Sequence, residues 1–139
     1  MTPSRARLEL RAEIVTLAVV HAAITLALWF LPRRVVVTAT NINVFRVWPD
    51  VLSVDAARIL WGCAFLFAAL ALANLLHRRT IHAQMLAVGV VFFVDAWWFA
   101  SYTLPLLVGR GSALGTIAFT PLLLWPGFVI YRVAHGAGE

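Results

Sequence analysis

Asp95 is the residue whose position says most about possible chemistry, because it lies near the middle of a long apolar run. A carboxylate at the centre of a bilayer costs at least ~2.5–3.5 kcal/mol on insertion scales. We therefore expect Asp95 to face the interior of a helical bundle, either protonated or paired. His21 lies at a matching depth in another apolar run, and its imidazole can hydrogen-bond to a carboxyl group. Three further side chains are expected as polar neighbours of this pair: Thr25, Ser101 and Tyr102.

Two interpretations of the pair formed by His21 and Asp95 remain open. In the functional interpretation, the pair senses or carries a proton, or lines a polar pore. In the structural interpretation, it is an interhelical hydrogen bond worth about 0.6–2 kcal/mol in a membrane. The structural interpretation is favoured, because polar side chains commonly join membrane helices in this way.

The sequence contains no recognisable motif for catalysis or for metal binding. It has no GxSxG, no HExxH, no pair of cysteines and no glycine-rich phosphate loop. Asp95 is the only acidic residue deep in an apolar run, so neither a carboxylate dyad nor a Ser/His/Asp set can be assembled. The other histidines, His77, His82 and His135, follow no ligand spacing. We therefore expect a protein that is not an enzyme and that holds no metal or cofactor.

The composition requires lipid around most of the chain. Hydrophobic residues make up 63% of the sequence and charged residues 12%, against about 25% charged residues in soluble domains. A water-soluble domain of this length cannot hide so much apolar surface. The net charge is +5, and the eleven basic residues are all arginines near the ends of apolar runs, where they suit lipid phosphates better than nucleic acid. The sequence therefore predicts a single all-α integral membrane domain over residues 1–139, in a lipid bilayer and with no nucleic-acid partner.

Apolar runs of sufficient length predict four transmembrane helices in a small bundle, since one span needs about 20 mainly apolar residues. The expected helices cover about residues 4–31, 54–76, 81–104 and 112–133. Ser53 is a suitable N-cap for the second helix, with Asp55 in its positively polarised first turn. Pro105 is expected to end the third helix, and Pro121 and Pro126 to bend or break the fourth.

The segment 32–53, between the first two spans, has a different composition. Its valines and threonines at 35–40 favour extended structure, and Asn41 and Asn43 suit a turn. Residues 44–48 could return as a second strand. We therefore expect a short β-like hairpin or another ordered cap outside the membrane, with a flexible loop as the alternative.

Four spans place both termini on the same side of the membrane. Arginines barely distinguish the two sides, with six on the side of the termini and five on the other. The first helix often dominates orientation, and positive charge is concentrated at residues 77–79. We therefore expect a multi-pass protein of the inner cell membrane with cytoplasmic termini. Aromatic side chains expected as interfacial anchors are Trp29, Trp48 and Trp61 on the outer side and Tyr131 on the inner side.

Helical spans in a short chain, with an ionisable residue inside the membrane and several tryptophans, resemble the architecture of small multidrug-resistance transporters. That family carries its essential acid in the first helix, whereas here the first helix has His21 and the acid is Asp95 in the third. The long segment 32–53 also departs from that compact pattern. The resemblance therefore extends to architecture alone, and no family residue is carried over. Holins are also similar at this level, being short, basic, multi-pass and without catalytic motifs.

These observations favour a non-catalytic membrane protein that acts by assembly. It would assemble either with itself, as a holin-like pore, or with other membrane proteins, as an accessory subunit of a larger complex. Small residues four apart, such as Ala96 and Ala100, permit close helix packing of either kind. The alternative is a small proton-linked transporter that uses Asp95 and His21. A membrane enzyme is the least favoured class.

Overall fold

Every element is a helix in a computed structural model that describes residues 3–37, 42–46, 52–76, 81–109 and 113–136. The long helices are α1 (Pro3–Phe30), α4 (Val54–Leu75), α5 (Ile81–Leu107) and α6 (Ala113–Gly136), and the short ones are α2 (Arg33–Val36) and α3 (Ile42–Phe45). Three stretches, Leu10–Phe30, Val54–Leu75 and Leu86–Leu107, are long and apolar enough to cross a membrane. The apolar part of α6, Ala113–Val129, is shorter. The chain is thus all-helical, with the apolar helices of a multi-pass membrane protein.

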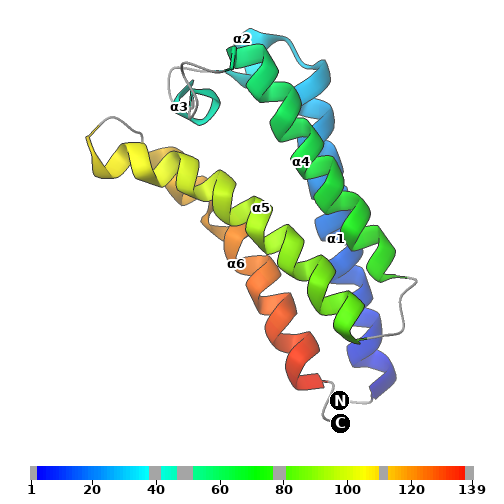
Figure 1. The fold of residues 1–139 in the computed structure, drawn as a ribbon. Coiled ribbons are helices and arrows are strands. Elements are labelled where there is room, and N and C mark those ends of the chain that lie inside the picture. Colours follow the sequence, from blue (N-terminus) through cyan, green and yellow to red (C-terminus); the bar gives the residue numbers. More distant parts are fainter. Residues whose placement is uncertain (1–2, 38–41, 47–51, 77–80, 110–112, 137–139) are drawn as a thin grey trace.

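The long helices form two antiparallel hairpins, with α1 packed along α4 and α5 packed along α6 (Figure 1). Helix α4 also packs on α5, and this contact joins the hairpins. The hairpins lie close together near the chain termini and diverge toward the end that carries α2 and α3 (Figure 1). The start of α1 and the end of α6 lie at the same end of the bundle, the arrangement that an even number of passes produces (Figure 1).

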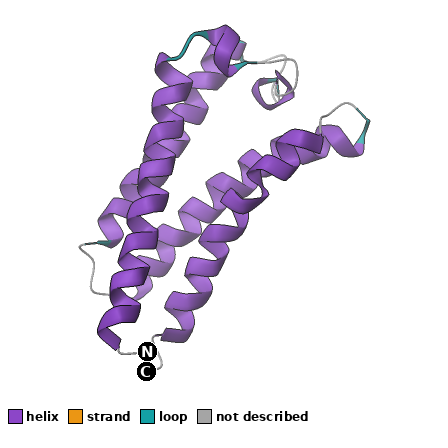
Figure 2. Ribbon diagram, turned by 180° about the vertical axis from the view of Figure 1, so that it is seen from behind, coloured by secondary structure: helices purple, strands orange, loops and turns teal. Residues whose placement is uncertain are grey.

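The prediction of a β-like segment between the first two long helices was wrong for the residues that the structure describes there. These residues form α2 and α3, and no strand is present among the described parts of the chain (Figure 2). Residues 38–41 and 47–51 lie outside the description. β-propensity depends strongly on context, and an isolated hairpin is marginally stable. Helix α3 instead gains contacts with α4 and α5, which a two-stranded ribbon would have to forgo.

The prolines do not break the helices in which they lie. Helix α5 passes Pro105 and ends at Leu107, and α6 is unbroken through Pro121 and Pro126. Membrane helices tolerate proline, because neighbouring groups satisfy the backbone carbonyls that it frees. The end of α5 is set instead by Gly109, which adopts φ 71° and donates its N–H to the Leu106 carbonyl at 3.0 Å. This left-handed conformation suits glycine and commonly ends a helix.

Trp98 of α5 is the centre of the apolar core between the two hairpins. Its ring lies 4.7 Å from that of Trp61 and 5.1 Å from that of Phe65, both on α4, between ring centroids. Phe45 of α3 and Phe119 of α6 meet the same ring edge-on, at 6.1 and 5.8 Å. Edge-on aromatic pairs contribute about 0.5–1.5 kcal/mol each beyond burial. This cluster therefore joins α3, α4, α5 and α6 around one side chain.

Gly62 allows α1 to lie directly on α4. A Cβ at this position would overlap the indole ring of Trp29. Two hydrogen bonds cross at the same level: Thr25 Oγ1 donates to the Gly62 carbonyl at 3.2 Å, and Trp29 Nε1 donates to the Ile59 carbonyl at 3.2 Å. Small residues allow membrane helices to approach closely in this way.

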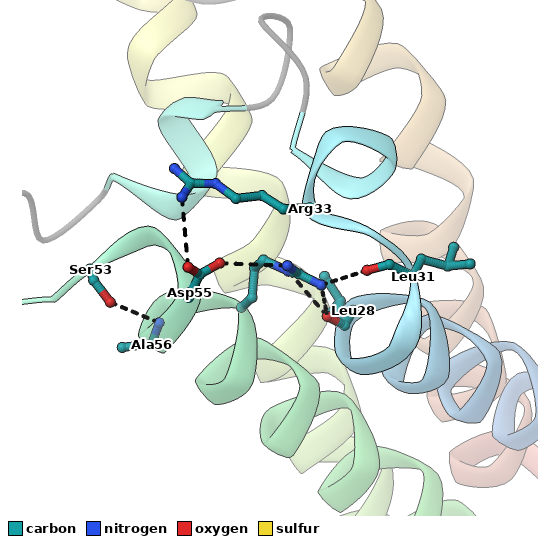
Figure 3. Close-up of polar contacts among 7 residues, drawn as sticks. Leu28, Leu31, Arg33, Ser53, Asp55 and Ala56 are labelled. Carbon is teal, nitrogen blue, oxygen red and sulfur yellow. Dashed lines mark hydrogen bonds and ion pairs between the residues drawn. The ribbon is translucent and has the colours of Figure 1, made fainter.

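Polar side chains organise the end of the α1–α4 hairpin near α2 (Figure 3). Ser53 Oγ accepts a hydrogen bond from the Ala56 N–H at 3.1 Å and so caps α4, with Asp55 in its first turn. The Asp55 carboxylate also bridges two arginines, Arg33 at 3.6 Å and Arg58 at 3.5 Å. A serine N-cap typically contributes about 1 kcal/mol.

Arg58 binds the C-terminal end of α1. The last carbonyls of a helix have no partner within the helix, and Pro32 has no N–H to offer. The Arg58 guanidinium donates to the Leu28 carbonyl through Nε at 3.2 Å and Nη2 at 2.7 Å, and to the Leu31 carbonyl through Nη2 at 2.9 Å. One side chain of α4 thereby satisfies a carbonyl in the last turn of α1 and the carbonyl of Leu31 just after it, and so fixes the hairpin at this end.

We predict that Arg58→Met lowers the free energy of unfolding by about 2 kcal/mol, because hydrogen bonds from a charged donor are lost. Methionine keeps the length of the side chain, so the change is confined to the polar head. Reversible unfolding in mixed detergent micelles measures the loss. Arg34→Met is the matched control, because the Arg34 side chain is exposed. Equal stability losses in the two variants would contradict the capping role.

Candidate functional site

The structure brings His21 of α1 and Asp95 of α5 together in the middle of the bundle. His21 Nε2 and Asp95 Oδ1 are 3.0 Å apart, and both side chains are fully buried. The contact links the α1–α4 hairpin to the α5–α6 hairpin, near the middle of the apolar stretches Leu10–Phe30 and Leu86–Leu107. It is a buried polar contact between two long apolar helices.

The second ring nitrogen of His21 also has a fixed partner. Nδ1 lies 2.7 Å from the carbonyl oxygen of Leu17, one turn earlier in α1. The Phe65 ring of α4 packs against the imidazole, with 5.6 Å between centroids. Both ring nitrogens and one face of the ring are thus constrained by three different helices, which hold the imidazole in a single orientation.

The three expected polar neighbours take different places. Thr25 is one turn from His21, and its hydroxyl donates to the carbonyl of His21 at 3.0 Å and to that of Gly62 at 3.2 Å. Ser101 donates within its own helix, to the Trp97 carbonyl at 2.9 Å. Tyr102 stacks on Phe119 of α6, with 5.1 Å between ring centroids. Thr25 therefore belongs to the surroundings of the pair, whereas Ser101 bonds within α5 and Tyr102 packs on α6.

Two buried polar atoms near the pair have no hydrogen-bond partner among the described residues. They are Asp95 Oδ2 and Trp98 Nε1, three residues apart on α5 and so on one face of the helix. The Phe65 ring packs against the rings of both His21 and Trp98. Sequence reasoning did not single out Trp98, although its spacing from Asp95 was the available signal.

The expected aromatic anchors bind to the protein as well as facing its surroundings. Trp29 donates its indole N–H to Ile59, and Trp61 donates to the Val44 carbonyl at 3.3 Å. Tyr131 is 58% exposed on α6. Trp48 lies outside the described residues. Trp29 and Trp61 therefore tie elements of the fold together, which their positions in the sequence did not indicate.

The end of the bundle near the termini has its own ion pair. Arg132 of α6 donates to Glu13 of α1, with 3.0 Å between Nη1 and Oε1. The same guanidinium lies 5.1 Å from the centre of the Phe128 ring. This ion pair joins the first and last long helices, which have few other contacts with each other.

The chemistry available at the central site is proton exchange and hydrogen bonding. Within the described parts of the chain, no three His, Cys, Asp or Glu side chains gather to hold a metal ion. His135 is exposed, with Nδ1 near the Tyr131 carbonyl at 2.9 Å. His77 and the side chain of His82 are outside the description. The pair itself combines a titratable acid with a titratable base.

Comparison with known proteins gives no match: no protein-family model, no curated protein and no solved structure is similar to this chain. Its function must therefore be argued from the geometry of its own residues.

We predict that His21→Ala lowers the free energy of unfolding by about 2 kcal/mol. It leaves the Asp95 carboxyl buried without a partner, and the loss is moderated because polar groups in a membrane-bound unfolded chain also find partners. Asp95→Asn is the matched control, since its amide keeps the volume and can still donate to His21 Nε2. Unfolding in mixed micelles should show a clearly smaller loss for Asp95→Asn. An equal loss would mean that the hydrogen bond does not decide stability.

Proposed function

We propose that this chain is a small, non-catalytic, multi-pass protein of the cell membrane that acts by assembly, as an accessory subunit of a larger membrane complex. The observation that carries the proposal is an exposed pair of aromatic rings in the middle of a span. Phe93 is 67% exposed and Trp97 44% exposed, and their rings stack with 6.4 Å between centroids.

The depth of these rings is unusual for side chains that merely face lipid. Both lie near the middle of the apolar stretch Leu86–Leu107, whereas tryptophan in membrane proteins gathers at the two interfaces. Large rigid aromatic side chains also dominate the energy of protein–protein contacts. Phe93 and Trp97, which we call the α5 aromatic pair, therefore suit contact with a helix of another membrane protein.

The remaining surface supports an accessory subunit better than a holin-like pore. The large exposed side chains of the spans are apolar, for example Val19 on α1, Leu70 on α4 and Ile117 on α6. Thr16 is exposed, but its hydroxyl donates a hydrogen bond to the Ala12 carbonyl of the same helix at 2.8 Å. The described side chains thus offer no continuous polar stripe to line a water-filled pore between copies.

Photo-crosslinking from the native membrane tests this proposal. A photoreactive phenylalanine analogue at position 93 or 97 should give one discrete adduct, because these positions would lie in a specific contact. The matched control is position 70, where Leu70 is 60% exposed on a different helix and should give only diffuse lipid adducts.

The mass of the adduct separates the forms of assembly. An adduct with a different protein supports the accessory subunit, and Trp97→Ala should then reduce its recovery in the intact complex. An adduct of twice the chain mass would overturn that role in favour of self-assembly. A single-chain particle in mild detergent, with no adduct at 93 or 97 beyond that at 70, would contradict assembly altogether.

A second candidate function is proton-linked transport, which is favoured by the buried pair of His21 and Asp95. The pair joins two hairpins that diverge toward one end of the bundle (Figure 1), so a change in its protonation could change their relative position. Ionisable pairs inside membranes commonly serve as proton relays.

Proteoliposomes with an imposed pH gradient and an internal pH-sensitive dye test this candidate. If the pair carries protons, the wild-type chain should dissipate the gradient, and Asp95→Asn should reduce the rate to that of empty vesicles. Equal rates for wild type and Asp95→Asn would exclude a proton path through Asp95.

A further inference from the structure

We infer that His21 and Asp95 form a binding site for one proton, and that loss of this proton separates α1 from α5. The site would hold this proton whether or not the chain transports anything. The two ring nitrogens of His21 have different partners, and these partners differ in what they can donate.

The partner of Nδ1 fixes the first proton. Nδ1 lies 2.7 Å from the Leu17 carbonyl oxygen, and a carbonyl can only accept a hydrogen bond. Nδ1 must therefore carry a hydrogen. In a neutral imidazole the other nitrogen, Nε2, is then an acceptor with a lone pair.

The contact on the other side requires a second proton. His21 Nε2 lies 3.0 Å from Asp95 Oδ1, and two lone pairs cannot form a hydrogen bond. The proton resides either on Oδ1, in a neutral acid that donates to a neutral imidazole, or on Nε2, in an imidazolium that donates to a carboxylate. Both arrangements contain the same number of protons, and in both the pair has no net charge.

Removal of the proton would leave a buried anion with no positively charged side chain beside it among the described residues. On α1, the nearest charged side chain is Glu13, which is bound to Arg132 of α6 near the termini. On α4, the described charged side chains are Asp55 and Arg58, which bind each other and α1 at the opposite end. On α5, Asp95 is the only charged side chain in the stretch Leu86–Leu107. The Phe65 ring packs against His21, and the Trp98 ring packs against Phe65.

The consequence is mechanical as well as electrostatic. Helix α1 packs on α4 and α5 packs on α6, and among the described side chains the His21–Asp95 bond links α1 to α5. A buried carboxylate without a partner is costly, and the cost is relieved if water enters between the helices. The stabilising contribution of the pair is therefore present while the proton is held, and it is lost as the pH rises and the proton leaves.

Asp95→Asn is the matched variant for testing this idea. The asparagine amide donates to Nε2 of a neutral imidazole, so the link is preserved with a donor that does not titrate. The variant should therefore hold α1 and α5 together at every pH at which the bundle remains folded.

The first test is NMR of the wild-type chain in lipid nanodiscs, with the histidine ring nitrogens isotopically labelled. The signals of His21 are assigned by their absence in His21→Gln. Below the pH of proton loss we expect Nδ1 to be protonated, with Nε2 either accepting a hydrogen bond or donating as an imidazolium. A neutral ring protonated at Nε2 and not at Nδ1 would overturn the inference.

The second test measures the separation of the helices. Spin labels are placed at Val19→Cys on α1 and Gly89→Cys on α5, in a Cys63→Ser background. Val19 is exposed, and a Cβ at Gly89 meets nothing within 4 Å. As the pH rises, the distance between labels should increase in the otherwise wild-type chain and stay constant with Asp95→Asn. No increase in the wild-type chain, or the same increase in both, would overturn the inference.

Discussion

The hydrogen bond between His21 and Asp95 is the contact on which the interior of this protein depends. Hydrocarbon cannot solvate a carboxyl group, so Asp95 must be enclosed by protein before α5 is stable in a membrane. Enclosure needs α1 on one side to supply the imidazole and α4 beside it to supply Phe65. The packing of the hairpins around this level, with Trp98 filling the adjacent core, follows from that requirement. A group that is costly in isolation thereby specifies how the two hairpins meet.

Polar backbone groups at the ends of the helices also need partners. Carbonyls at the end of α1 and amides at the start of α4 have no partner within their helices. Arg58 and Ser53 provide those partners across short distances (Figure 3). Trp29 and Trp61 add hydrogen bonds to backbone carbonyls of α4 and α3. The described residues at the α2 and α3 end of the hairpin are therefore tied to the long helices by hydrogen bonds, although they contain no strand.

The interior and the exterior of the bundle suit different functions. The interior holds a titratable pair within a shell of apolar and aromatic side chains, an arrangement suited to binding a proton. The exterior is apolar, with the α5 aromatic pair exposed at mid-span, and is suited to contact with other helices in the membrane. The two roles are compatible, because a change in the separation of α1 and α5 would alter the position of the surface that α5 presents.

The sequence by itself determined the helical architecture and the two residues at its centre. Both follow from local costs: apolar runs of spanning length need lipid, and an acid at mid-run needs a partner, with His21 the residue at matching depth. Only the tertiary structure decided what depends on neighbours distant in the chain. It made α2 and α3 from a segment with β-propensity, ended α5 at Leu107, just before Gly109, instead of at Pro105, and placed Trp98 at the core. It also assigned Arg58 to the carbonyls of α1. A hydrogen bond or ring contact between helices depends on their relative rotation and separation, which the spacing of residues along one helix does not specify.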